Sequence, residues 1–350
     1  MKLKTLPENF DLRGKRVLLR MDWNVALPAK GQPSTEGLMK IQNSIATIKM
    51  LAKRGAIVIL LTHVGRPEKF DAKLSTKRFI PLLKKRFHSA VQFHPDLRQP
   101  IKQARPGSIY LLENVRFEEG ESSNDLKLAQ AYAKFGDLYM NDAFASWQAQ
   151  TTIVGIPKFL PAYAGPELVK EVTVLSRLLS HPKRPFFAVI GGGKISTKLP
   201  VIKSLLKICD GVCVGGAIAN VMPAREAKNK KIFLPVDVVR SGDEIRDMGP
   251  KTLVSWRERL KSARTILWNG PVGMIEDPRF AKGSLALARM LAQDIPSSTY
   301  KIVGGGDTIP LVAKTKTTHQ FDHVSMGGGA MLEFLIHKGR LPGLVTLQKK

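Results

Sequence analysis

Three runs of three glycines, each closing an apolar stretch, constrain the fold of this chain more than any other feature of its sequence. The apolar stretches cover residues 186–190, 301–303 and 323–326, and the glycine runs follow at 191–193, 304–306 and 327–329. With 29 glycines among 350 residues, chance is not expected to give even one such run. An apolar run that ends in a glycine turn is typical of the carboxyl edge of a parallel sheet, where bare backbone N–H groups can approach a ligand closely.

Glycine turns at strand ends bind phosphate groups through these N–H groups. A tight turn needed only for packing would explain any one of the three runs. Because all three lie in the second half of the chain, the phosphate-binding interpretation is favoured.

Short apolar runs alternate with amphipathic stretches along the whole chain. We expect strands at residues 16–20, 56–61, 108–112, 137–140, 186–190, 211–215, 232–236, 265–268 and 300–303. Helical periodicity lies between them, for example at residues 41–53, 125–134 and 199–208. This alternation predicts an α/β fold with two related parallel sheets.

A chain of 350 residues is longer than one ordinary core requires, so two domains are expected. Residues 157–165 are rich in proline and alanine, and a helical stretch at 166–180 follows and ends at His181-Pro182. We therefore predict an N-terminal domain at 1–165, a connecting helix at 166–182 and a C-terminal domain at 183–335.

The composition favours a globular cytoplasmic protein. Apolar residues make up 43% of the chain, yet runs such as 56–61 are far too short to cross a bilayer, and residues 1–7 lack the apolar core of a signal peptide. No membrane partner is expected. Cys209 and Cys213 lie in and beside an apolar run, so we interpret both as core residues and not as a disulfide or metal site.

The net charge of +26, from 55 Lys and Arg against 29 Asp and Glu, would attract phosphorylated metabolites or RNA. The charge is spread along the chain, with neither a basic tail nor interleaved aromatic residues. It therefore predicts weak, nonspecific nucleic-acid contact at most.

Polar strings follow the predicted strands of the first half, at residues 20–24, 62–67, 112–117 and 141–144. Any one string is explained by turn capping or local pairing. All four, however, fall at the edge where open α/β sheets bind ligands. Because they include His63, Arg66 and Arg116, we expect a site for a small phosphorylated anion.

These strings and the glycine turns occur in an order that resembles the phosphoglycerate kinase family over nearly the whole chain. The matching motifs are R-x-D-[FW]-N, H-x-G-R-P, L-L-E-N-x-R-F, N-D-A-F, G-G-x-K-x-x-x-K, W-N-G-P-x-G, G-G-G-D-T and G-G-G-A. The resemblance implies two similar, doubly wound, Rossmann-like domains joined by a hinge helix. The first would bind 3-phosphoglycerate, the second would bind ATP or ADP with Mg²⁺, and residues 336–350 would return to the first.

The resemblance also implies the reaction, which is reversible phosphoryl transfer between 1,3-bisphosphoglycerate and ADP in glycolysis, by a monomer. Phosphoryl transfer needs charge neutralisation and alignment, and not a covalent nucleophile, so lysines, backbone N–H groups and Mg²⁺ suffice. Gly192-Gly193-Lys194 is not a Walker loop, because no Ser or Thr follows the lysine.

The site residues that the resemblance implies fall into four groups. Those expected to bind phosphoglycerate are Asp22, Asn24, His63, Arg66, Arg116 and Gln148. Those expected to act in catalysis are Lys40, Lys194, Gly327 and Gly328. Those expected to bind the nucleotide are Gly192, Gly193, Lys198, Gly216, Asn269, Pro271, Glu276, Gly305, Gly306 and Thr308. Asp307 is expected to reach the metal.

Several positions depart from the family pattern. Lys40-Ile41 stands where the family has a catalytic Arg-Ile, and residues 145–150 replace G-T-A-H-R-A-H, with Gln148 the counterpart of its arginine. Met326 and Thr197 replace a threonine and an aspartate, and residues 217–235 are shortened. These departures and the charge leave a second hypothesis open, a weakened kinase-like scaffold that binds nucleotide or RNA without turnover.

Overall fold

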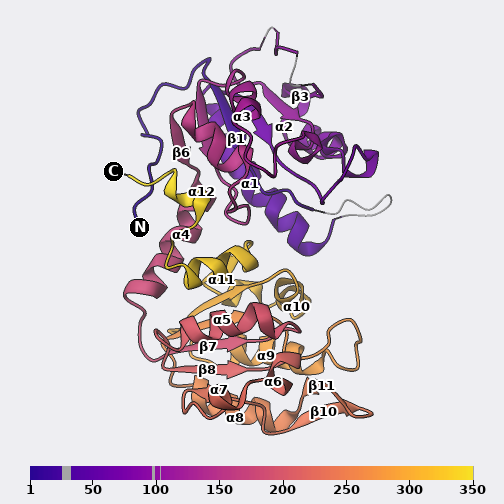
Figure 1. The fold of residues 1–350 in the computed structure, drawn as a ribbon, viewed down its shortest axis with the longest axis vertical. Helices are drawn as coiled ribbons and strands as arrows, with labels where there is room; N and C mark the ends of the chain where they lie inside the picture. The colour runs from indigo at the N-terminus through magenta and orange to yellow at the C-terminus, as the bar shows by residue number, and fades with distance from the viewer. Residues whose placement is uncertain (26–32, 97–98, 103, 350) are drawn as a thin grey trace. The chain divides into compact units, whose positions relative to one another are not determined.

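The structure is a computed structural model that describes residues 1–25, 33–96, 99–102 and 104–349 (Figure 1). The chain divides into two compact units. Unit 1 contains Met1–Thr173 together with the C-terminal segment from Arg340, and unit 2 contains Val174–Gly339. In the described residues, no helix is both long and apolar enough to cross a bilayer.

Unit 1 is built on a six-stranded parallel sheet with the strand order β3-β4-β2-β1-β5-β6. The strands are β1 (Arg16–Arg20), β2 (Ile57–Leu61), β3 (Val91–His94), β4 (Ile109–Leu112), β5 (Leu138–Asn141) and β6 (Ala162–Ala164). β1, β2, β4 and β5 are almost completely buried, which is typical of a sheet covered on both faces.

The helices of unit 1 are α1 (Thr35–Lys53), α2 (Ile80–Phe87), α3 (Leu126–Ala133), α12 (Pro342–Val345) and the first half of α4 (Pro166–Ser180). Ser34 caps α1 by accepting a hydrogen bond from the N–H of Gly37. The buried positions of α1 recur at three- and four-residue spacing, as Gly37, Ile41, Ser44, Thr47, Ile48 and Leu51. This spacing turns one face of α1 toward the sheet.

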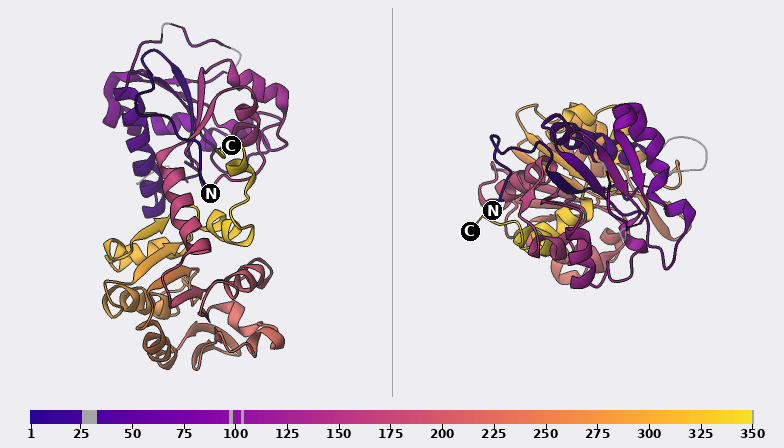
Figure 2. Two further views of the ribbon diagram at one scale, coloured as in Figure 1. Left: turned by 90° about the vertical axis from the view of Figure 1, so that its left-hand side faces the viewer. Right: turned by 90° about the horizontal axis from the view of Figure 1, so that it is seen from above.

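The two ends of the chain lie side by side in unit 1 (Figure 2). The N–H of Lys4 donates to the carbonyl of Leu347 at 2.8 Å, and Leu3 forms an antiparallel bridge with Gln348. The N–H of Gly343 donates to the carbonyl of Trp147 at 3.1 Å. The C-terminal segment is therefore part of unit 1.

Unit 2 contains a second six-stranded parallel sheet, with the order β14-β13-β12-β7-β8-β9. Its strands are β7 (Phe186–Ile190), β8 (Gly211–Val214), β9 (Ile232–Phe233), β12 (Thr265–Asn269), β13 (Tyr300–Gly304) and β14 (His323–Ser325). An antiparallel hairpin of β10 (Val238–Ser241) and β11 (Glu244–Met248) stands outside this sheet.

The helices that follow α4 in unit 2 are α5 (Ile195–Leu205), α6 (Ala217–Asn220), α7 (Ala224–Ala227), α8 (Pro250–Leu260), α9 (Lys282–Gln293), α10 (Thr308–Lys314) and α11 (Gly328–Ile336). Apolar residues of α8, α9 and α10 and of strands β7, β8, β12 and β13 form a core around Trp256 and Trp268. Cys209 and Cys213 are buried, as the sequence predicted.

The predicted fold class is confirmed, but the two sheets differ in one crossing. Counted along its own chain, unit 2 has the Rossmann order 3-2-1-4-5-6, whereas unit 1 places β4 between β2 and β3. Strands β3 and β6 and the β10-β11 hairpin were not expected from the sequence. β3 carries Gln92 and His94, and β6 lies in the proline- and alanine-rich stretch interpreted as a boundary, so neither has the apolar run of a central strand.

Candidate functional site

The residues predicted to bind phosphoglycerate follow neighbouring strands of the unit 1 sheet. Asp22 and Asn24 follow β1, and His63 and Arg66 follow β2. Arg116 lies on a short 3-10 helix, Val115–Phe117, directly after β4. Since β1, β2 and β4 are adjacent and parallel, their carboxyl ends meet at one edge, and the three loops come together there.

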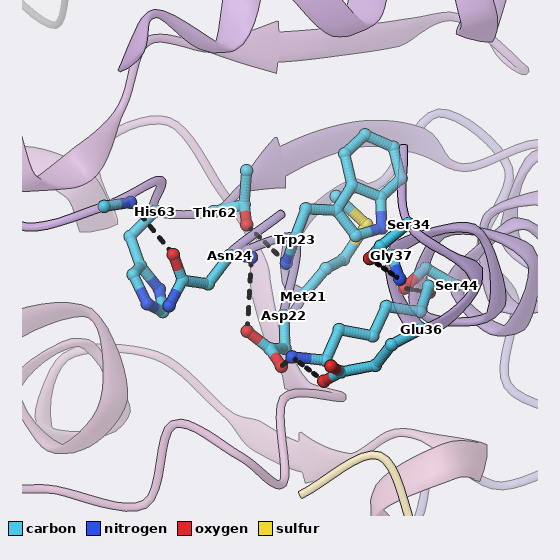
Figure 3. Close-up of polar contacts among 12 residues, drawn as sticks. Met21, Asp22, Trp23, Asn24, Ser34, Glu36, Gly37, Ser44, Thr62 and His63 are labelled. Carbon is cyan, nitrogen blue, oxygen red and sulfur yellow. Dashed lines mark hydrogen bonds and ion pairs between the residues drawn. The ribbon is translucent and has the colours of Figure 1, made fainter. Parts of the chain in front are cut away.

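Hydrogen bonds tie these three loops to one another, and Figure 3 shows those between the loops after β1 and β2. The N–H of Gly65 donates to Oδ1 of Asn24 at 2.9 Å, and the N–H of Trp23 donates to Oγ1 of Thr62 at 2.9 Å. Nη1 of Arg116 donates to the carbonyl oxygen of Gly65. Gly65 has a φ of +65°, which only glycine adopts without strain, so the loop after β2 can turn back toward its neighbours.

Lys40 lies between two carboxylates at this edge, and both acids appear in Figure 3. Its Nζ is 3.2 Å from Oδ2 of Asp22 and 3.0 Å from Oε1 of Glu36, and the side chains of Lys40 and Asp22 are each 11% exposed. Burial alone would lower the pKa of Lys40, but the two carboxylates raise it above its usual value. Burial likewise favours a higher pKa for Asp22, yet the attraction of Lys40 holds it below its usual range. The pair is therefore charged.

Gln148 does not join this group. It is an exposed residue after β5, and within the described residues its side chain makes no hydrogen bond or ion pair. Its place among the phosphoglycerate-binding residues stays a prediction.

The N-D-A-F string supports the fold of unit 1. Asp142 accepts a hydrogen bond from Thr47 of α1 at 2.6 Å and one from the N–H of Leu168 in α4 at 3.0 Å. Asn141 accepts from the N–H of Ala143 at 3.0 Å. The contacts of Asp142 join α1, the end of β5 and the start of α4, and the contact of Asn141 is the turn capping considered as the alternative for each string.

A buried polar chain beneath the same edge was not predicted from the sequence. Nε of Arg20 donates to Oγ1 of Thr152 at 3.0 Å, and that hydroxyl donates to Oε1 of Glu121 at 2.6 Å. Nη2 of Arg20 is 3.0 Å from Nδ1 of His63. The sequence signal for this chain was Arg20, which follows three apolar residues at the end of the strand and is the first letter of R-x-D-[FW]-N.

Glu121 should make the stability of this protein depend on pH. Burial raises the pKa of its carboxyl from 4.5 to about 7. A raised pKa means that the folded state binds the proton more tightly than the unfolded state, so this carboxyl costs stability as the pH rises from about 4.5 to about 7. Glu121→Gln removes that cost. We expect the free energy of unfolding of Glu121→Gln, relative to the parent, to rise by on the order of 2 to 3 kcal/mol between pH 4.5 and pH 8.

Urea unfolding at the two pH values measures this difference. Glu119→Gln, a change at an exposed neighbour, is the matched control and should show no such trend. A pH-independent difference for Glu121→Gln would contradict the prediction.

In unit 2, residues predicted to bind the nucleotide line a cavity of about 230 Å³. Its lining includes Gly192, Gly193, Gly216, Pro271, Glu276 and Asp307. A larger cavity, of about 630 Å³, lies in unit 1 around Phe70, Phe93 and Phe117 and is lined by none of the predicted site residues.

The glycine turns serve two purposes. A Cβ on Gly191 would lie 2.1 Å from the carbonyl oxygen of Pro271, and one on Gly328 would lie 2.3 Å from Cα of Gly305, so these positions need glycine for close backbone packing. A Cβ on Gly193 or Gly329 would meet nothing within 4 Å. Close packing therefore explains why Gly191 and Gly328 are glycines. It does not explain Gly193 and Gly329, where the backbone has open space beside it.

Lys198 and Asn269 connect the first glycine turn to the second. Nζ of Lys198 donates to Oδ1 of Asn269 at 2.6 Å, and Nδ2 of Asn269 donates to the carbonyl of Gly304 at 2.9 Å. Oγ1 of Thr308 accepts from the N–H of Gly270 at 2.8 Å. Burial lowers the pKa of Lys198 to about 8, although Asp307 favours its charged form. An anion beside Lys198 would favour the charged form further.

Three helices, α5, α10 and α11, begin at the glycine turns without side-chain caps. Lys194 is the N-cap of α5 and Gly327 is the N-cap of α11, and neither makes a side-chain cap hydrogen bond. α5 and α11 pack against each other. Uncapped N–H groups at helix N-termini attract anions, which suits phosphate oxygens.

Asp307 fits a metal ion that is bound together with phosphates. Its carboxylate is exposed beside the cavity, and the described residues contain no group of three or more His, Cys, Asp or Glu placed to hold a metal. Mg²⁺ is commonly held by one or two carboxylates, water and substrate phosphates. The residues present therefore fit Mg²⁺ carried by a nucleotide.

A family model described as phosphoglycerate kinase matches residues 8–232 and 221–338 of this chain. The two matches overlap at 221–232, inside the segment that the sequence indicated as shortened. In this segment the structure has the four-residue helices α6 and α7 and the two-residue strand β9. Gly216, at the start of this segment, lines the cavity described above.

Phosphoglycerate kinases of known sequence and structure match nearly the whole chain. The protein of Thermus thermophilus is 38% identical, and the match covers 97% of this chain and 98% of that protein. The protein of Coprothermobacter proteolyticus is 36% identical, covering 99% of each. The structure of phosphoglycerate kinase from Coxiella burnetii has a TM-score of 0.83 at 34% identity, and that from Pyrococcus horikoshii OT3 has 0.84 at 27%, covering 97% and 98% of this chain.

The fold and these matches define an α/β kinase. The chain belongs to the phosphoglycerate kinase family.

Proposed function

We propose that this chain transfers a phosphoryl group reversibly between 1,3-bisphosphoglycerate and ADP, giving 3-phosphoglycerate and ATP. The observation that carries the proposal is that the two sheets of this family member present different kinds of residues at their carboxyl edges. Basic and polar residues lie at the carboxyl edge of the unit 1 sheet. Glycine turns and two lysines lie at the carboxyl edge of the unit 2 sheet.

The unit 1 residues suit a phosphorylated carboxylic acid. Arg66 and Arg116 would neutralise its charges through planar, paired N–H groups. Oδ1 of Asn24 already accepts from Gly65, so the amide nitrogen of Asn24 is left as a donor. Burial and the charge of Arg20 lower the pKa of His63 to about 3, so its ring would bind as a neutral hydrogen-bond donor.

The unit 2 residues suit a nucleoside di- or triphosphate. Lys194 and Lys198 would neutralise phosphate oxygens, with Gly327 and Gly328 supplying backbone at the start of α11. Pro271 and Glu276 would line the nucleoside side. Mg²⁺, held by Asp307 and the phosphates, would reduce their charge during transfer.

A coupled assay with 3-phosphoglycerate and ATP tests this function. We expect turnover that depends on both substrates and on Mg²⁺. Nucleotide binding without any turnover would instead identify the chain as a kinase-like scaffold. Measuring nucleotide affinity by calorimetry on the same sample separates this outcome from an inactive preparation.

Lys40→Arg should raise kcat/KM. The lysine supplies one compact charge between Asp22 and Glu36, whereas an arginine would add a planar fork for the carboxyl-phosphate oxygens. One restored charged hydrogen bond of about 1.5 kcal/mol corresponds to roughly a tenfold gain. Gln148→Arg should mainly lower KM for the acid, and the two changes should help more together.

Lys49→Arg, at an exposed position of the same helix, is the control and should leave the kinetics unchanged. Loss of activity on introducing arginine at position 40 would mean that the site is built around the shorter lysine, and would favour a substrate other than 3-phosphoglycerate.

We further propose a cytoplasmic monomer whose excess charge gives weak, nonspecific contact with nucleic acid. Because distributed lysines bind phosphates through counterion release, RNA binding should fall steeply with salt. Filter binding to two unrelated RNAs at low and at physiological salt measures this. Tight, sequence-selective binding at physiological salt would contradict it.

A further inference from the structure

A buried contact joins the guanidinium of Arg20 to the imidazole ring of His63. Arg20 is completely buried and His63 is 5% exposed. Nη2 of Arg20 lies 3.0 Å from Nδ1 of His63, and no other hydrogen bond to the imidazole ring is found in the described residues. Figure 3 places His63 beside Asn24, at the edge of the proposed phosphoglycerate site.

The chemistry of this contact determines which ring nitrogen carries the proton. A guanidinium has five N–H donors and no acceptor. Nδ1 of His63 must therefore accept, and in a neutral ring the proton then resides on Nε2. The charged groups that act on His63 are Arg20, Arg116 and Lys40, which disfavour a charged ring, and Asp22, which favours it.

Arg20 is itself held in place from its other side. Its Nε donates to Oγ1 of Thr152, which donates to Glu121, and its Nη1 donates to the carbonyl of Met21. The second oxygen of Glu121 accepts from the N–H of Thr152 at 3.1 Å. The guanidinium is thus oriented by groups on three separate segments before any ligand arrives.

We propose that Arg20 is a positioning residue that fixes the His63 proton on Nε2, so that the ring presents a donor to the phosphorylated acid. The identity of the acid rests on the proposed function. The protonation of the His63 ring does not depend on that function. It gives a role in binding to an arginine that is completely buried.

The unaltered protein provides the first test. Long-range ¹H–¹⁵N correlation spectra distinguish the two neutral tautomers of histidine, and His63→Gln assigns the His63 signal among the 7 histidines. We expect a single Nε2-protonated tautomer whose signals stay unchanged from about pH 5 to about pH 8. A proton on Nδ1, a mixture of tautomers, or titration within this range would overturn the proposal.

Substitution of the arginine provides the second test. Arg20→Met should give a mixture of the two neutral tautomers, whereas Arg20→Lys, which keeps a charged donor, should preserve the Nε2 proton. Arg16→Met, on the same strand, is the matched control and should leave the His63 signals unchanged. If Arg20→Met does not fold, the spectra of Arg20→Lys and of the unaltered protein still decide.

Binding of 3-phosphoglycerate by calorimetry provides the third test. The amide nitrogen of Gln reaches roughly as far as Nε2, and that of Asn only as far as Nδ1, so His63→Gln should bind about tenfold more tightly than His63→Asn. Equal loss in both variants would count against a donor at Nε2. An Nε2 proton in a protein that neither binds nor turns over 3-phosphoglycerate would support the positioning role while contradicting the proposed function.

Discussion

Lys194→Ala is expected to lower kcat by on the order of 10² to 10³ while leaving the fold and much of the nucleotide affinity intact. Lys194 is exposed at the N-terminus of α5, and in the described residues its ammonium makes no hydrogen bond or ion pair, so its removal breaks no contact in the protein. A charge used mainly in the transition state affects kcat more than affinity.

Steady-state kinetics and nucleotide titration on the same variant separate the two effects. Lys230→Ala removes an exposed lysine elsewhere in unit 2 and serves as the control. Near-parental kcat in Lys194→Ala would remove this residue from the catalytic group.

Arg66→Ala and Arg116→Ala should each raise KM for 3-phosphoglycerate roughly tenfold to a hundredfold, because a charged hydrogen bond is worth about 1.5 to 3 kcal/mol. The two variants should differ in stability. Arg66 is exposed, so Arg66→Ala should unfold like the parent. Arg116 is half-buried and bonds the carbonyl of Gly65, so Arg116→Ala should also lower the free energy of unfolding by about 1 kcal/mol.

Initial rates at varied 3-phosphoglycerate, together with urea unfolding, measure both expectations. Arg105→Ala, at an exposed arginine of unit 1, should change neither quantity. An unchanged KM in both test variants would exclude this edge of unit 1 as the acid-binding site.

The fold class and the positions of the glycine turns follow from the sequence alone. Alternating apolar and amphipathic segments leave few arrangements other than parallel sheets covered by helices. Local chemistry also fixed where the strand-end strings lie, because a polar run directly after a buried strand falls at its carboxyl end. These signals are short-range, so they can be read without knowing which strands are neighbours.

The tertiary structure alone decided which of those residues touch. Arg20, His63, Glu121 and Thr152 are far apart in the sequence, and they form one hydrogen-bonded chain because β2 and β5 both flank β1. Strand order is also a difference between the two units. The fourth strand of the unit 1 sheet, β4, lies between β2 and β3, whereas the fourth strand of the unit 2 sheet, β12, lies beside the first, β7. Nothing local specifies a strand's neighbour, because the pairing is chosen by packing over the whole sheet.

The glycine runs show, for single residues, the same difference between what the sequence predicts and what the tertiary structure adds. The sequence placed all three turns correctly at strand ends, but it gives no signal that distinguishes Gly191 from Gly193. One of them faces a carbonyl oxygen that excludes any side chain, and the other faces open space. Only the approach of a distant segment, here Pro271, distinguishes a glycine required for packing from one that leaves room for a ligand.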